Sequence, residues 1–175
     1  KKTPKRHQEA ALRGIVPALR KADRASVIMA CGTGKTQLSL WVAEAIAKRT
    51  VLVLVPSLAL LRQTLKEWVN ETKWEDYDYL CVCSDATVNR GEDELIIRPT
   101  ELEFSVSTKP SQVRDFLRRP FSGVKIVFST YQSADVVGKG MPRGSAFDIG
   151  IFDEAHKTAG RDGGKFSFAL SDKNL

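Results

Sequence analysis

The sequence predicts an α/β fold in which a mainly parallel β-sheet carries helices on both faces. Apolar runs of strand length recur along the chain, and the run at residues 51–55 is continuous rather than alternating. Such continuous runs are typical of strands that are covered on both sides. Segments with helical spacing of apolar residues lie between the runs, and strands that alternate with helices indicate parallel pairing. The main polar motifs follow strand ends, where ligands bind in folds of this class.

The first predicted elements surround a glycine-rich turn. A helix is expected after Thr3-Pro4, with a kink near Pro17. The apolar residues 26–30 then indicate a buried strand, and residues 37–47 have the apolar spacing of a helix. Residues 29–36 read Met-Ala-Cys-Gly-Thr-Gly-Lys-Thr. A strand, a glycine-bearing turn, Gly-Lys-Thr and a helix together form the context of a phosphate-binding P-loop.

This loop is predicted to bind the phosphates of a nucleotide. Gly32 and Gly34, on either side of Thr33, let the backbone aim its N–H groups inward at the positive end of a helix dipole. Lys35 would reach the β- and γ-phosphates, and the Thr36 hydroxyl would bind Mg²⁺. The strict motif places its first glycine where this chain has methionine, so the alternative is a glycine-rich helix start that binds nothing.

Further strands and helices follow in alternation. The strand at residues 51–55 ends at Pro56-Ser57, and residues 58–71 place their apolar side chains on one helical face. The next apolar run, residues 79–83, is again strand-like. Periodicity is lost at residues 84–104. Because long loops without structure are uncommon inside compact domains, we expect a surface insertion there.

The C-terminal part continues the same alternation. Pro110 opens and Pro120 closes a short predicted helix, because proline is favoured at a helix start and cannot continue a helix. Residues 124–128 and 147–152 are the strongest remaining strands, and a short last segment is expected at residues 166–170. The sheet is therefore predicted to contain strands from both halves of the chain.

The composition is that of an ordinary globular domain. The chain has 175 residues, of which 42% are hydrophobic and 27% charged, and this suits one domain or one lobe of a larger protein. No apolar run has the length of a membrane span, and no secretory leader is visible. The net charge of +6 favours a polyanionic partner only weakly. Because the chain begins with Lys1 instead of methionine, we expect an excised piece of a longer protein.

The three cysteines are predicted to be buried thiols in a reducing cytoplasm. Cys31, Cys81 and Cys83 do not form a disulfide framework. Cys81 and Cys83 lie in an apolar run, and a lone Cys-x-Cys without a second pair is poor support for the alternative, a zinc site.

Asp153 and Glu154 directly follow the last strong strand. A P-loop alone does not hydrolyse phosphates, since hydrolysis needs one carboxylate for Mg²⁺ and another that orients or deprotonates water. Asp153 would serve the metal and Glu154 the water. An Asp-Glu pair after an apolar run is by itself usually a solvated turn, but its coincidence with Gly34-Lys35-Thr36 predicts ATPase chemistry, with Lys35 as a catalytic residue.

Several motifs occur in an order that resembles one large enzyme family. Residues 30–36 resemble motif I, A-x-x-G-x-G-K-T, in which the position before the alanine is free, and residues 153–156 read Asp-Glu-Ala-His, the DEAH box. Residues 55–63 resemble motif Ia, residues 129–133 the threonine-containing motif, and residues 6–8 the upstream glutamine motif. The chain thus resembles the first RecA-like, ATP-binding domain of superfamily 2 DEAH-box helicases and translocases. Its finer pattern resembles helicase-like subunits of bacterial restriction and phage-defence systems.

The resemblance implies roles for further residues. Gln8 would contact adenine, and its alternative is a polar residue in an exposed first turn. His156 would couple the nucleotide site to the segment below the sheet. Ser57, Arg62 and Thr130 would touch the sugar–phosphate backbone of a nucleic acid, DNA more than RNA, without reading its sequence. For Arg62, a solvated helix face is the alternative.

Two other function classes stay open at this point. One is a P-loop ATPase of a transport or remodelling system without nucleic acid. The other is a binding module without hydrolysis, and the presence of Glu154 argues against it.

Motors of the family that this chain resembles hold ATP between two RecA-like lobes, so we expect the second lobe, and any nuclease or methyltransferase domains, outside this chain. An arginine finger contributes roughly 10³–10⁵-fold in related NTPases. We therefore expect this piece alone to hydrolyse ATP very slowly.

Overall fold

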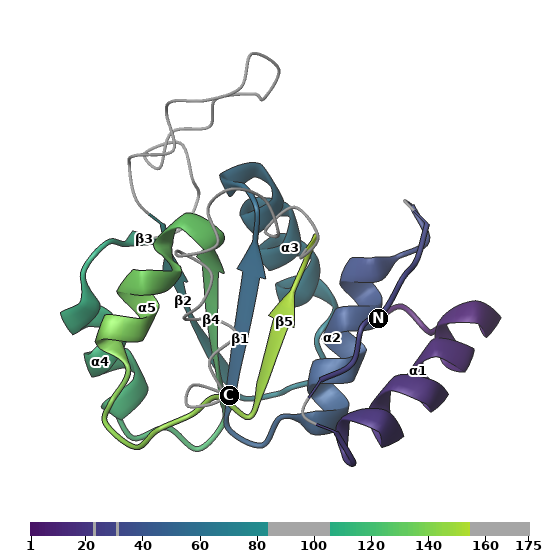
Figure 1. The fold of residues 1–175 in the computed structure, drawn as a ribbon, viewed down its shortest axis with the longest axis horizontal. Helices are drawn as coiled ribbons and strands as arrows, with labels where there is room; N and C mark the ends of the chain where they lie inside the picture. Colours follow the sequence, from purple (N-terminus) through teal and green to yellow (C-terminus); the bar gives the residue numbers. More distant parts are fainter. Residues whose placement is uncertain (23, 31, 84–105, 155–175) are drawn as a thin grey trace.

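The computed structural model describes residues 1–22, 24–30, 32–83 and 106–154. Its centre is a five-stranded sheet with the order β3-β2-β4-β1-β5, in which every neighbouring pair is parallel (Figure 1). The predicted α/β fold with a parallel sheet is thereby confirmed. The insertion predicted at residues 84–104 and the last segment at residues 166–170 lie outside the described residues.

The observed elements follow the predicted order closely. The helices are α1 (Arg6–Leu19), α2 (Lys35–Ile46), α3 (Leu58–Glu71), α4 (Pro110–Arg118), α5 (Ala134–Gly140) and the short 3-10 helix η3 (Tyr131–Ser133). The strands are β1 (Thr50–Val55), β2 (Tyr77–Val82), β3 (Val106–Ser107), β4 (Val124–Thr130) and β5 (Ile149–Phe152). The sequence did not predict β3, η3 or α5, because two or three residues show no periodicity and α5 contains two glycines. None of the described helices combines the length and the apolar character needed to cross a membrane.

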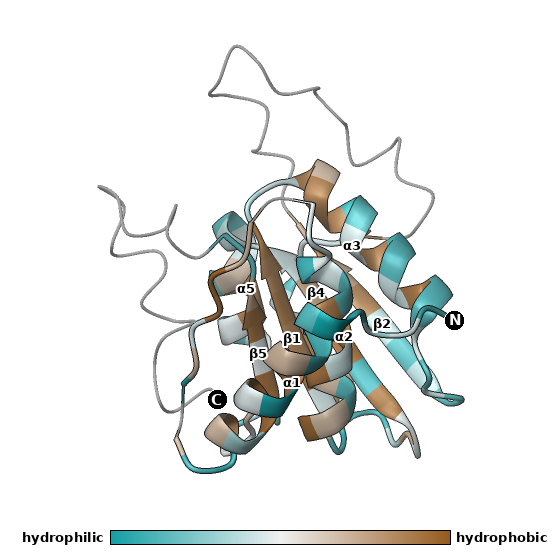
Figure 2. Ribbon diagram, turned by 90° about the vertical axis from the view of Figure 1, so that its right-hand side faces the viewer, coloured by the Kyte–Doolittle hydropathy of each residue, from teal (hydrophilic) through white to brown (hydrophobic). Residues whose placement is uncertain are grey.

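β1 lies inside the sheet, and its side chains contribute to the core on both faces. Val51, Val53 and Val55 belong to the hydrophobic cluster beneath α2 and α3, whereas Leu52 and Leu54 belong to the cluster beneath α4 and α5 (Figure 1). All five side chains are at most 1% exposed, and the hydropathy colours show β1 as an apolar strand between the helical layers (Figure 2). The continuous apolar run is therefore explained by helices on both faces of the sheet.

The prediction of a buried strand at residues 26–30 is wrong. Residues 24–30 form no strand, and the side chains of Val27 and Ile28 are 43% and 99% exposed. An apolar run shows that a segment would gain from burial, but a strand also needs a neighbouring backbone for its hydrogen bonds. β5 is paired with β1 on one edge, and no described segment pairs with its other edge. The run at residues 26–30 stays unpaired although, within the described residues, this edge of β5 is open, so its apolar character alone does not make it a strand.

Asp148 directly precedes β5, which begins at Ile149 instead of at the predicted residue 147. One oxygen of its carboxylate, Oδ2, accepts hydrogen bonds from the backbone N–H groups of Lys48, Arg49 and Thr50, at 2.9, 2.5 and 2.9 Å. Hydrogen bonds to a charged acceptor are stronger than neutral ones. Asp148 thus attaches the turn between α2 and β1 to the start of β5, and this fixes the two strands relative to each other.

Cys81 and Cys83 are buried, at 0% and 1% exposure, and this confirms the predicted burial of these two thiols. Burial, with a smaller contribution from Cys83, raises the pKa of the Cys81 thiol well above its usual range. The Cys81 thiol therefore stays protonated at neutral pH. Cys31 lies outside the described residues.

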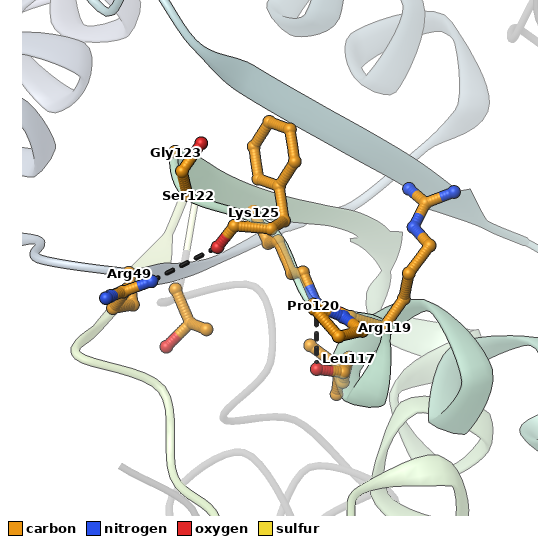
Figure 3. Close-up of a pocket in the computed structure, with 9 residues that line it drawn as sticks. Arg49, Leu117, Arg119, Pro120, Ser122, Gly123 and Lys125 are labelled. Atoms are coloured by element: carbon orange, nitrogen blue, oxygen red, sulfur yellow. Dashed lines mark hydrogen bonds between the residues drawn. The ribbon is translucent and has the colours of Figure 1, made fainter.

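Lys125 is a charged residue in the interior of β4, with 6% of its surface exposed. Its Nζ donates hydrogen bonds to the carbonyl oxygens of Phe116 and Leu117, at 2.8 and 2.9 Å, and to that of Arg119. Figure 3 shows Lys125 beside Leu117 and Arg119. These carbonyls end α4 and have no partner within the helix. Burial and then the neighbouring Arg119 lower the pKa of Lys125, and Asp78 opposes that change. Lys125 therefore caps α4 from the adjoining strand.

Replacing this buried cap is expected to destabilise the fold. We predict that Lys125→Met lowers the free energy of unfolding by roughly 2–4 kcal/mol, because three carbonyls lose their donor at a buried site. Urea denaturation of both proteins measures the difference. The matched control is Lys139→Met in α5, whose side chain is 70% exposed and pairs with Asp135, where a change within about 0.5 kcal/mol is expected. Equal effects of the two substitutions would contradict the capping role.

Candidate functional site

The carboxyl ends of β1, β4 and β5 meet at one edge of the sheet. Ser57 follows β1, Tyr131 follows β4, and Asp153 and Glu154 follow β5. The N-terminus of α2 lies at the same edge, since Lys35, its first residue, contacts Glu154. The structure therefore gathers four of the motifs singled out in the sequence at one place.

The phosphate loop has the backbone conformation that only glycine adopts readily. Gly32 and Gly34 have φ angles of +76° and +84°, in the left-handed region. Between them, Thr33 closes the loop through a hydrogen bond from its Oγ1 to the Ala30 carbonyl, at 2.7 Å. Gly34 precedes α2 as its N-cap residue, so an L-amino acid with a side chain at this position would strain the helix start.

The first turn of α2 leaves backbone donors for a ligand. The first hydrogen bond of the helix runs from Leu38 N to Gly34 O, at 3.0 Å. The N–H groups of Lys35, Thr36 and Gln37 precede it and have no acceptor within the helix. The Thr36 hydroxyl makes no hydrogen bond within the described part of the chain. Together with the helix dipole, these donors suit an anion.

Lys35 and Glu154 form an ion pair, with 3.1 Å between Nζ and Oε1. They lie 119 positions apart in the sequence, and the contact joins the phosphate loop to the end of β5. Their side chains are 33% and 21% exposed, and partly exposed pairs contribute little net stability. The pair therefore matters because it places the phosphate loop beside the end of β5, and it adds little to the stability of the fold.

Asp153 connects the end of β5 to two neighbouring elements. Its N–H donates to the Leu54 carbonyl on β1, at 2.9 Å, and its carbonyl accepts a hydrogen bond from the Tyr131 hydroxyl, at 2.8 Å. Tyr131 is buried at 5% exposure. Burial, then Asp153 and Glu154, raise the pKa of its hydroxyl well above the usual range, so the hydroxyl stays protonated. The sequence singled out the segment around Tyr131 but gave this residue no role, because nothing in the pattern shows a tertiary hydrogen bond.

Gln8 is buried at 5% exposure and holds the phosphate loop against α1. Its Nε2 donates to the carbonyls of Thr33 and Gly34, at 3.0 and 3.5 Å, and its Oε1 accepts from Lys5 N, at 2.9 Å. A Cβ on Gly34 would lie 2.4 Å from this Nε2. The alternative of an exposed polar residue is therefore wrong, whereas the contact with adenine stays a prediction.

The residues predicted to touch nucleic acid lie at the same edge, with different accessibility. Ser57 is the N-cap of α3, where its Oγ accepts from Leu60 N at 3.3 Å, and Arg62 is half-buried one turn later. Thr130 is fully buried, and its hydroxyl donates to Ser133 Oγ at 3.3 Å, so it faces away from solvent in this conformation. His156 lies outside the described residues.

A cavity of about 600 Å³ lies at the other edge of the sheet, at the amino ends of β1 and β4 (Figure 3). Its cationic side chains already have partners within the protein. Arg49 donates to the Phe121 carbonyl at 3.1 Å, Arg119 pairs with Asp78, and Lys125 caps α4. The cavity is separate from the candidate site, because it lies at the opposite edge of the sheet.

A family model and several known proteins match this chain. The family described as type III restriction enzyme, res subunit, matches residues 1–169. A probable helicase of African swine fever virus, from a South African tick isolate, is 30% identical over 143 residues, which are 81% of this chain and 15% of that protein. The corresponding helicase of a Malawian tick isolate is 29% identical over the same length.

Two solved structures of restriction enzymes have the same fold. One is a nuclease-deletion mutant of the Type ISP restriction-modification enzyme LlaGI in complex with a DNA substrate mimic, at 33% identity and a TM-score of 0.75. The other is the ATP-dependent Type ISP restriction-modification enzyme LlaBIII bound to DNA, at 32% identity and a TM-score of 0.81. Both matches cover 99% of this chain, but only 16% and 12% of those chains. The chain thus spans a small part of the length of its relatives.

Because Gln8 contacts the phosphate loop, removing its side-chain amide is expected to loosen this loop. In Gln8→Leu, we expect the backbone amides of the first turn of α1 and of the phosphate loop to exchange with solvent deuterium roughly 5- to 30-fold faster, because the hydrogen bonds by which the Gln8 side chain joins the two segments are lost. Hydrogen-exchange mass spectrometry measures this change. Gln63→Leu, at an exposed glutamine on α3, is the control and should leave exchange of the loop unaltered. Unchanged loop exchange in Gln8→Leu would refute the role.

Proposed function

The chain belongs to the type III restriction enzyme res subunit family, and from this membership we propose that it is the first RecA-like, ATP-binding lobe of an ATP-dependent DNA helicase or translocase. The observation that carries the proposal is the 3.1 Å contact between Lys35 Nζ and Glu154 Oε1. It brings a loop suited to phosphates to a pair of carboxylates suited to metal and water. Residues 1–175 would form this lobe, with residues 84–104 as a surface insertion.

The residues at the site fit a nucleoside triphosphate with Mg²⁺. The loop from Gly32 to Thr36 offers backbone donors and the Lys35 ammonium, and these groups match the charge and the acceptor oxygens of phosphates. Mg²⁺ takes few protein ligands beside phosphate oxygens and water, and Thr36 and Asp153 provide a hydroxyl and a carboxylate. The bound ion would neutralise charge on the phosphates.

The protein groups would divide the chemistry as follows. In this structure Lys35 is paired with Glu154. When a nucleotide occupies the loop, Lys35 would bind phosphate oxygens instead, and this change of partner would release the Glu154 carboxylate. Glu154 would then orient a water molecule and accept its proton. The weak net energy of a partly exposed ion pair makes such an exchange of partners inexpensive. Gln8 would hold the loop and contact adenine.

DNA as the track is supported by the relatives and by the position of the motifs. The two solved structures contain DNA or a mimic of it. Ser57 and Arg62 lie at the start of α3, on the edge of the sheet that carries the nucleotide site. Thr130 is buried, whereas Gln132 in η3 is exposed, so Gln132 would be the side chain of that segment that contacts a nucleic-acid strand. Contacts with the sugar–phosphate backbone would be insensitive to sequence and sensitive to salt.

The parent protein would supply the remaining parts. A second RecA-like lobe with an arginine finger, the coupling through His156, and nuclease or methyltransferase domains belong to this proposal, as does a cytoplasmic location. The relatives are more than six times longer than the matched segment, which leaves room for such domains.

The proposal predicts an ATPase that nucleic acid stimulates. In the full-length parent, Glu154→Gln is expected to lower the hydrolysis rate by at least roughly 100-fold while ATP still binds, since the group that accepts the proton of water is lost. Steady-state rates with duplex DNA, single-stranded DNA and RNA would identify the track. Glu75→Gln, at an exposed glutamate between α3 and β2, is the matched control.

The outcomes separate the candidate functions. Stimulation by one nucleic acid, abolished in Glu154→Gln, supports the motor and names its substrate. Hydrolysis that no nucleic acid changes would leave the alternative, a P-loop ATPase of a transport or remodelling system.

A further inference from the structure

Glu154 adopts a backbone conformation that its side chain disfavours. Among the described non-glycine residues it is the one with a positive φ, at +53°. Residues with a Cβ adopt this region rarely and only where the surrounding structure imposes it. The conformation of Glu154 therefore depends on the groups that hold its peptide plane.

The carbonyl of Asp153 and the N–H of Glu154 belong to one planar peptide group. A hydrogen bond to that carbonyl consequently fixes the plane from which the Glu154 side chain departs. The Tyr131 hydroxyl donates this bond, at 2.8 Å, and Asp153 N donates to the Leu54 carbonyl on the β1 side, at 2.9 Å. The two peptide groups that flank Asp153 are thus each attached to a neighbouring element, one to β1 and the other to Tyr131 in η3.

Tyr131 is itself held firmly. Its ring belongs to the hydrophobic cluster that includes Leu52, Leu54 and Phe147, and it is 5% exposed. A buried hydroxyl is costly unless it makes a hydrogen bond, so the bond to Asp153 is strongly favoured. Tyr131 also follows Thr130 directly, at the start of the segment that is expected to face DNA.

We infer that Tyr131 is a positioning residue for Glu154, which holds the 153–154 peptide so that the carboxylate faces the phosphate loop. The inference rests on the proposed function of Glu154 and deepens it. It also makes the end of β4 a physical link between the DNA-facing segment and the residue that activates water. Tyr131 itself touches neither nucleotide nor water in this assignment.

Tyr131→Phe in the full-length parent tests the inference, because it removes the hydroxyl and keeps the ring. We expect kcat for DNA-stimulated ATP hydrolysis to fall about five- to tenfold, while KM for ATP changes by less than about twofold. Tyr79→Phe is the matched control. The Tyr79 ring packs edge-on against Phe128, with 6.5 Å between ring centroids, and its hydroxyl makes no hydrogen bond within the described residues, so no change is expected.

A double-mutant cycle distinguishes positioning from a general structural effect. If Tyr131 acts through the Glu154 carboxylate, Tyr131→Phe should have no further effect on single-turnover hydrolysis once Glu154→Gln is present. A residue that only stabilises the lobe would lower the rate by the same factor in both backgrounds. Thermal unfolding of each variant shows whether the lobe stays folded.

Each result decides the inference. A lower kcat with unchanged KM, and no further effect in Glu154→Gln, supports it. An unchanged kcat, effects that multiply, or loss of the folded state in Tyr131→Phe would overturn it. A parent enzyme without nucleic-acid-stimulated hydrolysis would instead contradict the proposed function, and this result is read from the unmodified protein alone.

Discussion

The backbone hydrogen bonds that β1 makes along both of its edges determine where the candidate site lies. On one side Val55 is in register with Thr130, and on the other Leu54 is in register with Phe152. Because all three strands are parallel, the residues that follow them emerge at one edge of the sheet. A slip of one residue in either pairing would turn Asp153 or Tyr131 to the opposite face. The bond between Asp148 and the turn before β1 secures this register from the other end.

The site is held together mainly by neutral contacts to the backbone. Gln8 and Tyr131 each place a side-chain donor on a carbonyl of the loop or of the 153–154 turn. The ion pair between Lys35 and Glu154 is more exposed and contributes less net energy. This division keeps the loop and the turn in place while the two charged groups remain able to change partners.

The sequence predicted much of the fold, because continuous apolar runs and helical spacing are local signals. The helix predicted at about residues 58–71 is α3, and parallel pairing brought Asp153 and Glu154 to the phosphate loop. Other features depend on tertiary contacts that leave no trace in a local pattern. The capping of α4 by Lys125 and the burial of Gln8 are of this kind. The prediction of a strand at residues 26–30 was wrong, because an apolar pattern does not show whether a neighbouring strand pairs with the segment.

The exposed residues before the phosphate loop also bear on how this chain behaves in concentrated solution. Ile28 is almost fully exposed, and within the described residues the outer edge of β5 carries unpaired backbone donors and acceptors. Apolar side chains in water, together with an open strand edge, favour intermolecular pairing between copies of a protein. The net charge of +6 opposes such contacts through electrostatic repulsion. Salt weakens that repulsion, so the ionic strength of the buffer governs the colloidal stability of the chain.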